Sequence, residues 1–369
     1  MKVLFLVVCK KHHASVQVRV RQYLSYLAES GIQYELMGYS SRLFQTIVNS
    51  AGSYREDRRL YRRCMRWFLY RLSRLLKKIE PPLKLLELKW KIYSENPDVI
   101  FIQKVLVPQW FLNQIRKTGC SVVYDFDDAV YLNSAEGFNN MLRAANLVLA
   151  GNPYMEDLVR GKCSRVLCFP STIDSGLFSS KGSISPSKKM VVGWLGGPST
   201  IKYLDMVSEA LRSLTSLGYS FTFKVVGDRG RGLRGVNLEG INYKLMPYYG
   251  PEDIPKIVQG FDIGLMPLED SEHELGKCAM KALIYMAAGV PVVSSAVGEI
   301  MNIVTHNEDG FLVNDSEGWF NAIRSLLDSR ELCTQIGQAG RTRVENDYSI
   351  DMWGKCLCRE LLQLAGDRA

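Results

Sequence analysis

The residues of this chain most suited to chemistry lie in the segment GKCAMKALIYMAAGVPVVSS, residues 276–295. Lys277 and Lys281 stand at the start of an amphipathic stretch, which Gly289 separates from a β-branched run. This pattern predicts a loop, a helix and a buried parallel strand in succession. The amides and the dipole at a helix N-terminus favour an anion, and two lysines at the same end add formal charge. The segment therefore predicts a phosphate-binding site.

A second group of charged residues is Asp125-Phe126-Asp127-Asp128, which follows the apolar run SVVY. Carboxylates at the carboxyl end of a strand stand where α/β proteins place function, and their mutual repulsion predicts a raised pKa for at least one of them. Two of them at DxD spacing could hold Mg²⁺ or Mn²⁺ on a phosphate-containing ligand. Alternatively, Asp125 or Asp128 caps the following helix.

Basic side chains also gather near the N-terminus, in KHHASVQVRVR, residues 11–21. Arg19 and Arg21 could engage a phosphate or carboxylate of a ligand, or lie on a solvent-facing side of a helix. His12 and His13 could act as general bases, although two adjacent histidines in a loop are more often simply exposed.

The elements that position these residues follow from alternating strand-like and helical patterns. Strand-like runs before the linker at 179–189 occupy residues 3–8, 34–37, 99–103, 121–125, 147–150 and 165–169. Those after it occupy residues 190–193, 221–226, 242–245, 262–266, 291–294 and 310–313. Such alternation predicts two Rossmann-like domains with parallel sheets covered on both faces, and a ligand-binding cleft between the domains.

The segment 276–295 resembles the nucleotide-sugar site of the retaining glycosyltransferases of family 4, closest to a bacterial branch with the motif GKC…K…YMAxGxPVV. Three further segments resemble the same family: VVGWLGGPSTIKYL (191–204), FDIGLMPL (261–268) and VGEIMNIVTHNEDGFLV (297–313). The resemblance covers nearly the whole chain. It implies an α/β protein of the GT-B fold, with two Rossmann-like parallel-sheet domains facing a central cleft.

The resemblance also implies a domain organisation. Residues 1–178 would form an N-terminal acceptor domain with a basic helical excursion at 55–91. Residues 186–350 would form the C-terminal domain that binds the nucleotide-sugar donor, and residues 351–369 a last helix that crosses back to the N-terminal domain.

The donor site implied by the resemblance combines a glycine loop with the start of the 276–295 segment. Its residues are Gly196, Gly197, Ser199, Thr200, Gly227, Gly276, Lys277, Cys278 and Lys281. Family members usually carry an Arg and a Lys where this chain has Trp194 and Ser199, so Lys277 and Lys281 are the natural substitutes on the diphosphate. The two family glutamates fall on Gly276 and Ile284, which leaves Glu274 as an off-register substitute for holding the ribose.

On the acceptor side, Asp127 occupies the place where many relatives carry a histidine that faces the sugar ring and the acceptor. The resemblance therefore implies a catalytic or polar role for Asp127, in addition to the catalytic roles that it implies for Lys277 and Lys281. Ser15 and Arg19 match a Ser and an Arg that line the first loop and helix in this branch. Asp125 and Asp128 are the further acceptor-side candidates.

The function implied is transfer of a sugar, with retention, from a UDP- or GDP-sugar to a glycan or lipid-linked acceptor in cell-envelope polysaccharide or glycolipid synthesis. The resemblance implies neither a cofactor nor a metal, because protein cations neutralise the diphosphate. Two alternatives remain open. With several family positions altered, the chain could be a non-catalytic sugar-nucleotide-binding or scaffold protein, and it could also be a GT-B sugar-nucleotide epimerase.

Composition is consistent with a globular protein: 47% of the 369 residues are apolar and 23% are charged. Nine cysteines without a CxxC pair favour a reducing compartment over a disulfide framework. The apolar run at 3–9 is too short for a signal peptide, and no run approaches the ~20 residues that span a bilayer. We expect a cytoplasmic protein, or one peripheral at the inner face of the membrane.

The net charge of +8 is concentrated between Arg55 and Lys91. This stretch holds thirteen Lys or Arg against four Asp or Glu, a net +9, which leaves about −1 for the rest of the chain. Aromatic and Leu residues at 67–76 interleave with the bases at helical spacing, as in helices that bind anionic membranes. The alternative is a solvated helical excursion; nucleic acid is not favoured because no binding motif accompanies the charge.

Overall fold

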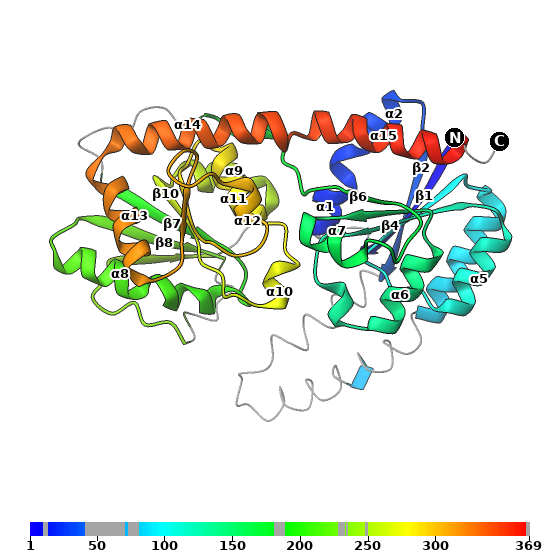
Figure 1. Ribbon diagram of the computed structural model, residues 1–369, viewed down its shortest axis with the longest axis horizontal. Coiled ribbons are helices and arrows are strands. Elements are labelled where there is room, and N and C mark those ends of the chain that lie inside the picture. The colour runs from blue at the N-terminus through cyan, green and yellow to red at the C-terminus, as the bar shows by residue number, and fades with distance from the viewer. Residues whose placement is uncertain are drawn as a thin grey trace. The chain divides into compact units, whose positions relative to one another are not determined.

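The computed structural model describes residues 1–9, 14–40, 71–72, 81–180, 189–227, 233, 235–247 and 250–366. The chain divides into two compact units, and each is built on one six-stranded parallel sheet (Figure 1). Unit 1 comprises Met1–Gly151, Met155–Phe169 and Gly354–Ala369, whereas unit 2 comprises Asn152–Tyr154 and Pro170–Trp353. The predicted α/β class with two Rossmann-like sheets is confirmed.

The sheet of unit 1 has the strand order β2-β1-β3-β4-β5-β6, and every neighbouring pair is parallel. Its strands are β1 (Lys2–Cys9), β2 (Gln33–Ser40), β3 (Val99–Gln103), β4 (Ser121–Phe126), β5 (Leu147–Ala150) and β6 (Val166–Cys168). Strands β3, β4 and β5 are buried along their whole length, as apolar runs covered on both faces must be. The register sets Gln103 opposite Asp125, so polar residues meet at the carboxyl ends of β3 and β4.

Helices connect these strands. They are α1 (Ala14–Arg19), η1 (Arg21–Tyr23), α2 (Leu24–Glu29), a helix at residues 81–95, α5 (Gln109–Lys117), η3 (Val130–Leu132), α6 (Ala135–Ala144) and α7 (Pro153–Val159). Helix α6 begins after Ser134, whose hydroxyl accepts the Gly137 N–H at 3.1 Å. The last helix, α15 (Ile350–Gly366), belongs to unit 1 from Gly354 onward.

The sheet of unit 2 has the order β12-β11-β10-β7-β8-β9 and is also parallel throughout. Its strands are β7 (Met190–Leu195), β8 (Phe221–Val226), β9 (Tyr243–Met246), β10 (Ile263–Met266), β11 (Val292–Ser295) and β12 (Phe311–Val313). Alternate residues of β7 enter two separate apolar clusters, Val192 and Trp194 in one and Val191 and Leu195 in the other. The sheet therefore has a hydrophobic core on each face.

The connections of unit 2 include several short helices. They are η4 (Ser175–Leu177), η5 (Ile201–Leu204), α8 (Asp205–Ser216), η6 (Pro251–Asp253), α9 (Ile254–Gln259), α10 (Glu272–Leu275), α11 (Met280–Ala287), α12 (Ile300–Ile303), α13 (Ser316–Asp328) and α14 (Arg330–Asp347). Helix α8 packs beside α13, and α11 packs beside α14 (Figure 1). The loop, helix and strand predicted for residues 276–295 are confirmed, with the helix at α11 and the strand at β11.

Some of the predictions fall outside the described residues. Of the basic segment 55–91, the structure describes residues 71–72 and 81–91, and of the linker 179–189 it describes residues 179, 180 and 189. His12 and His13 also lie outside the described residues. Across the part of the chain that the structure describes, no helix combines the length and apolar character needed to cross a bilayer.

Candidate functional site

The glycine loop of unit 2 depends on a close backbone approach between the ends of β7 and β8. The Gly196 N–H donates to the Val226 carbonyl at 3.0 Å. Gly227 has a φ of +113°, and a Cβ at this position would lie 1.7 Å from the Gly196 carbonyl oxygen. A Cβ on Gly196 would in turn lie 2.3 Å from the Trp194 ring. Only glycine fits at either position without displacing a neighbour, so the ends of β7 and β8 can approach each other closely at this loop.

The N-terminus of α11 reaches the same loop. Its N-cap is Ala279, which has a φ of +45° and no capping side chain, so the first amides of the helix lack the usual side-chain acceptor. Lys281 lies in the first turn, and its Nζ is 3.4 Å from Thr200 Oγ1 and 5.0 Å from the centre of the Trp194 ring. The two segments predicted to form a donor site thus come together within unit 2.

Burial makes the charge of Lys281 costly. Loss of water around the ammonium, together with repulsion from the Lys277 ammonium, lowers the pKa of Lys281 to about 8, although Glu274 opposes this change. Near neutral pH the side chain is therefore a weakly solvated cation. A nearby anion would restore much of the lost solvation free energy, so this environment favours a negatively charged ligand.

Glu274 pairs with the other lysine of this segment, Lys277. Its carboxylate is 1% exposed, and Oε1 accepts hydrogen bonds from the Tyr203 hydroxyl at 2.8 Å and from Lys277 Nζ at 2.6 Å. The other oxygen, Oε2, is buried and has no hydrogen-bond partner among the described residues. Lys277 precedes α11 instead of opening it, because the left-handed Ala279 delays the helix to Met280. The Lys277 charge is thus already shared with a buried carboxylate.

Of two residues that sequence reasoning missed, Asn152 supports this loop and Glu299 follows a glycine that packs against it. Asn152 Nδ2 donates to the Leu275 and Lys277 carbonyls at 2.9 and 3.0 Å, which fixes the turn that contains the buried Gly276 and Cys278. Glu299 follows Gly298, where an added Cβ would lie 3.3 Å from the Glu274 carbonyl oxygen.

Glu299 is a carboxyl group close to its titration midpoint at neutral pH. Burial raises the pKa of Glu299 to about 7, and a hydrogen bond from Asn302 offsets part of that rise. The sequence signal available for this residue was an acid directly after a glycine in the segment 297–313. Other residues predicted to bind the donor lie in the glycine loop. Ser199 and Gly197 are exposed, and the Thr200 hydroxyl donates to the Gly197 carbonyl at 3.2 Å.

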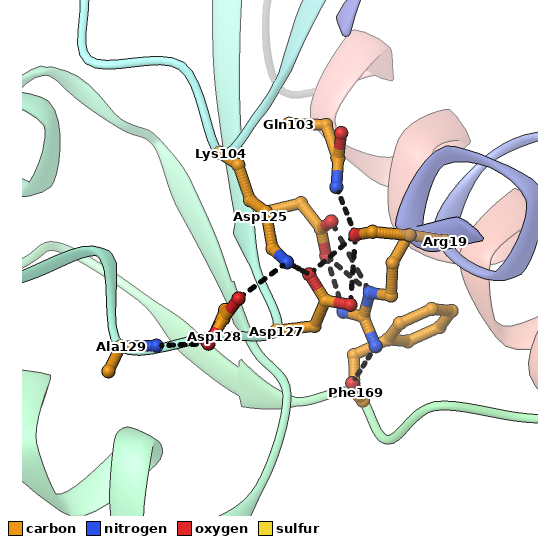
Figure 2. Close-up of polar contacts among 9 residues, drawn as sticks. Arg19, Gln103, Lys104, Asp125, Asp127, Asp128, Ala129 and Phe169 are labelled. Atoms are coloured by element: carbon orange, nitrogen blue, oxygen red, sulfur yellow. Dashed lines mark hydrogen bonds and ion pairs between the residues drawn. The ribbon is translucent and has the colours of Figure 1, made fainter. Parts of the chain in front are cut away.

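Unit 1 contains a separate polar cluster around Asp127 (Figure 2). Ser15 Oγ lies 2.8 and 2.9 Å from the two Asp127 oxygens, and Lys104 Nζ lies 2.8 Å from Oδ1. Gln103 Nε2 donates to Ser15 Oγ at 2.7 Å, which directs the single hydroxyl proton of Ser15 toward Asp127. The cluster thus joins the start of α1 to the carboxyl ends of β3 and β4.

Asp127 is held as a carboxylate. Burial alone would raise its pKa, but the Lys104 ammonium, the Arg19 guanidinium and the hydrogen bonds from Lys104 and Ser15 together outweigh burial and lower the pKa of Asp127 below its ordinary value. The Asp127 and Lys104 side chains are 10% and 11% exposed, so a small part of each reaches solvent. An ionised carboxylate in this setting can accept a hydrogen bond or a proton from a hydroxyl group.

Lys104 adopts a backbone conformation that is rare for its residue type. Its φ is +59°, and its N–H donates to the Asp125 carbonyl at 2.8 Å. The left-handed turn directly after β3 directs the ammonium to Asp127 and, at 3.4 Å, to Asp128 (Figure 2). Strained residues of this kind cluster at functional sites. Sequence reasoning missed both Gln103 and Lys104; the available signal was their place at the end of the strand beside DFDD.

Arg19 and Asp125 differ from the prediction that they face an acceptor. Both side chains are fully buried, and Arg19 Nε lies 3.1 Å from Asp125 Oδ1 while Nη1 donates to the Phe169 carbonyl at 2.5 Å. The guanidinium also lies 4.9 Å from the Phe169 ring centre. Burial raises the pKa of Asp125, and the Arg19 guanidinium counters part of that rise. This pair binds the core of unit 1 together and does not present a ligand-binding surface.

The two other hypotheses for residues 125–128 also fail. The N-cap of η3 is Ala129 with no capping side chain, and α6 is capped by Ser134, so neither Asp125 nor Asp128 caps a helix; Asp128 instead accepts the Ala129 N–H at 3.0 Å. A DxD metal site does not fit either, because Asp125 and Asp127 point to separate cations, Arg19 and Lys104. Within the described ranges, no group of three or more His, Cys, Asp or Glu is arranged to hold a metal ion.

Comparisons with known proteins locate the family signal in unit 2. Residues 189–329 match a family described as glycosyl transferases group 1. The chain is 24% identical over 230 residues to the putative colanic acid biosynthesis glycosyltransferase WcaL of Escherichia coli K12. The aligned region covers 58% of this chain and 55% of the relative. It is 26% identical over 172 residues to the amylovoran biosynthesis glycosyltransferase AmsK of Erwinia amylovora, covering 44% and 42% of the two chains. The chain thus spans about half the length of the curated relatives it matches.

A solved structure shows the fold across the full chain. The crystal structure of Anabaena Alr3699/HepE in complex with UDP-glucose has a TM-score of 0.68 and is 17% identical, covering 98% of this chain and 100% of that chain. This similarity establishes the two-sheet α/β architecture of the GT-B fold.

The Asp127 cluster yields a direct electrostatic prediction. We expect Lys104→Met to raise the pKa of Asp127, because the variant keeps the side-chain length but removes the nearest positive charge. Carboxyl ¹³C NMR titration of the full chain would measure the change. Lys104→Arg, which keeps the charge, should leave the pKa low. An unchanged Asp127 pKa in Lys104→Met would show that Lys104 does not control this carboxylate.

Proposed function

We propose that this chain is a glycosyltransferase that transfers a sugar, with retention, from a nucleoside diphosphate-sugar to a glycan or lipid-linked acceptor. One observation carries the proposal: Lys277, Lys281 and the glycine loop come together within the very segment that matches glycosyl transferases group 1. The UDP-glucose bound to a protein of the same fold supports a UDP-sugar as donor. The names of the two curated relatives support polysaccharide synthesis as the process.

The proposed donor chemistry is electrostatic. As the bond between the sugar and the diphosphate breaks, negative charge develops on the leaving diphosphate. Lys281, the amides at the start of α11 and the exposed part of Lys277 would stabilise this charge at fixed positions. The poor solvation of Lys281 adds to the effect, since a half-buried ammonium gains more from an anion than a fully hydrated one does. Protein cations would then serve in place of a metal ion.

The proposed acceptor chemistry uses Asp127 of unit 1. Its carboxylate is kept ionised by Lys104 and oriented by Ser15, so it would accept a hydrogen bond from an acceptor hydroxyl and orient that hydroxyl group. In a transfer with retention the acceptor attacks from the side of the leaving group, so its proton would pass to an oxygen of the departing diphosphate. Lys104 and Ser15 are positioning residues in this scheme. Arg19 and Asp125 support the cluster from the core without contacting the substrate.

Calorimetric titration with UDP- and GDP-sugars, paired with a transfer assay on envelope glycan and lipid-linked acceptors in excess EDTA, tests the proposal. We expect tight binding of one donor, acceptor-dependent release of its nucleoside diphosphate, and full activity in EDTA. Binding without hydrolysis or transfer would instead identify a sugar-nucleotide-binding protein. Conversion of the donor sugar without any acceptor would identify an epimerase, and activity that EDTA abolishes and metal restores would overturn the metal-free chemistry.

Lys277 is expected to bind the donor diphosphate. A charge-assisted hydrogen bond contributes ~1.5–3 kcal/mol, so Lys277→Ala should reduce transfer by roughly one to two orders of magnitude. Because this change also leaves the buried Glu274 carboxylate without its cation, Glu274→Gln/Lys277→Ala should be measured beside it, with thermal unfolding as a check of folding. The matched control is Lys202→Ala, since Lys202 pairs with the exposed Glu269. Loss of activity in Lys202→Ala with full activity in Lys277→Ala would refute this placement of the phosphates.

Donor binding should depend on pH through Lys281. Its pKa of about 8 lies below the ordinary lysine value, and a bound anion favours the charged form, so UDP binding should take up a proton and weaken as pH rises from 7 to 9.5. Phosphate groups themselves ionise near pH ~6, outside this window. Calorimetry in buffers of different ionisation enthalpy would measure the proton uptake. Lys281→Arg should bind UDP with little pH dependence. If the UDP affinity of this variant falls with pH as steeply as that of the wild type, Lys281 is not the source of the pH dependence.

A further inference from the structure

The helix at residues 81–95 of unit 1 has two apolar faces. One face packs into the core through side chains that are at most 4% exposed: Leu85, Leu88 and Ile92. The other face carries four large side chains that are between 59% and 65% exposed: Leu83, Leu86, Trp90 and Tyr93. We call these four residues the outer stripe. Their spacing of three and four residues places them along one side of the helix, opposite the core.

The outer stripe is unusual for a surface. Single exposed apolar side chains are normal, but four aligned ones that include a Trp and a Tyr mark a site of interaction. Trp and Tyr are also the side chains that concentrate at the boundary between lipid headgroups and hydrocarbon. The stripe lies on a convex helix face, which suits insertion into a soft, planar surface.

The charge of the neighbouring sequence identifies the surface. Residues 55–80, which directly precede the helix, contain ten Lys or Arg and three Asp or Glu. Two of the three lysines of the helix contribute less, because Lys84 pairs with Glu87 at 2.6 Å and Lys91 pairs with Glu35. An apolar aromatic stripe that follows a strongly basic segment matches an interfacial helix on anionic lipid, which attracts the basic side chains.

We propose that the helix at residues 81–95 docks on the surface of an anionic lipid bilayer, with the outer stripe inserted at the level of the headgroups. The helix would lie in the plane of the interface, its core face still packed on unit 1. This inference goes beyond the proposed function, because it holds whether or not the chain transfers sugars.

Vesicle sedimentation of the full chain tests the inference. Wild-type protein should sediment with vesicles of phosphatidylglycerol and phosphatidylcholine and remain in solution with pure phosphatidylcholine. Leu86→Ser/Trp90→Ser should weaken this binding by about tenfold or more, because it removes the apolar contact and keeps every charge. Trp90→Phe, which keeps an aromatic side chain, should bind nearly as well as the wild type.

The matched control is Leu177→Ser/Leu217→Ser, which removes two leucines of the other unit that are 65% and 64% exposed. This control should bind vesicles like the wild type, and circular dichroism should show that all variants are folded. Wild-type protein that ignores anionic vesicles, or a stripe variant that binds them as well as the wild type, would overturn the inference. A stripe variant that keeps vesicle binding but loses a dimer in light scattering would assign the stripe to a second copy of the chain instead.

Discussion

Both candidate sites depend on how charged side chains with little access to solvent are paired. At the carboxyl ends of the two sheets, carboxylates sit in the protein interior and each is matched by a cation: Asp125 by Arg19, Asp127 by Lys104 and Glu274 by Lys277. An unmatched buried charge would cost several kcal/mol, so these pairs fix the orientation of the side chains around them. The geometry of each site follows from this pairing.

Much of the fold could be predicted from the sequence, because it depends on the spacing of apolar residues along the chain and on where glycines stand. Continuous apolar runs separated by helical patterns predict parallel sheets, and the segment 276–295 gave its loop, helix and strand in the right order. Gly196 and Gly227, which the resemblance marks as donor-site candidates, lie where close backbone approach at strand ends requires glycine. These are local constraints that a sequence expresses directly.

The pairing of charged side chains could not be predicted in the same way. Helical spacing does not reveal that Arg19 turns into the core to meet Asp125, 106 residues away. Nothing in its residue type predicts that Lys104 takes a left-handed conformation, which is imposed by the β3–β4 edge and held by its own ion pairs. The residue type of Ala279 does not predict its left-handed conformation either, which starts α11 at Met280 and leaves Lys277 before the helix, paired with Glu274. The positions of Arg19 and Lys104 depend on tertiary contacts between segments that are distant in the sequence.

The Glu274–Lys277 pair constrains how the proposed donor would bind. Removing the cation from a buried carboxylate costs about 3–5 kcal/mol, whereas a new charge-assisted hydrogen bond to phosphate contributes about 1.5–3 kcal/mol. A diphosphate that took Lys277 away from Glu274 would therefore lose more than it gained. Lys277 is 28% exposed and an ammonium has three donors, so it can keep Glu274 Oε1 and still reach an anion from its open side. The magnitudes favour a shared lysine, with Lys281 as the cation whose charge changes most when the anion binds.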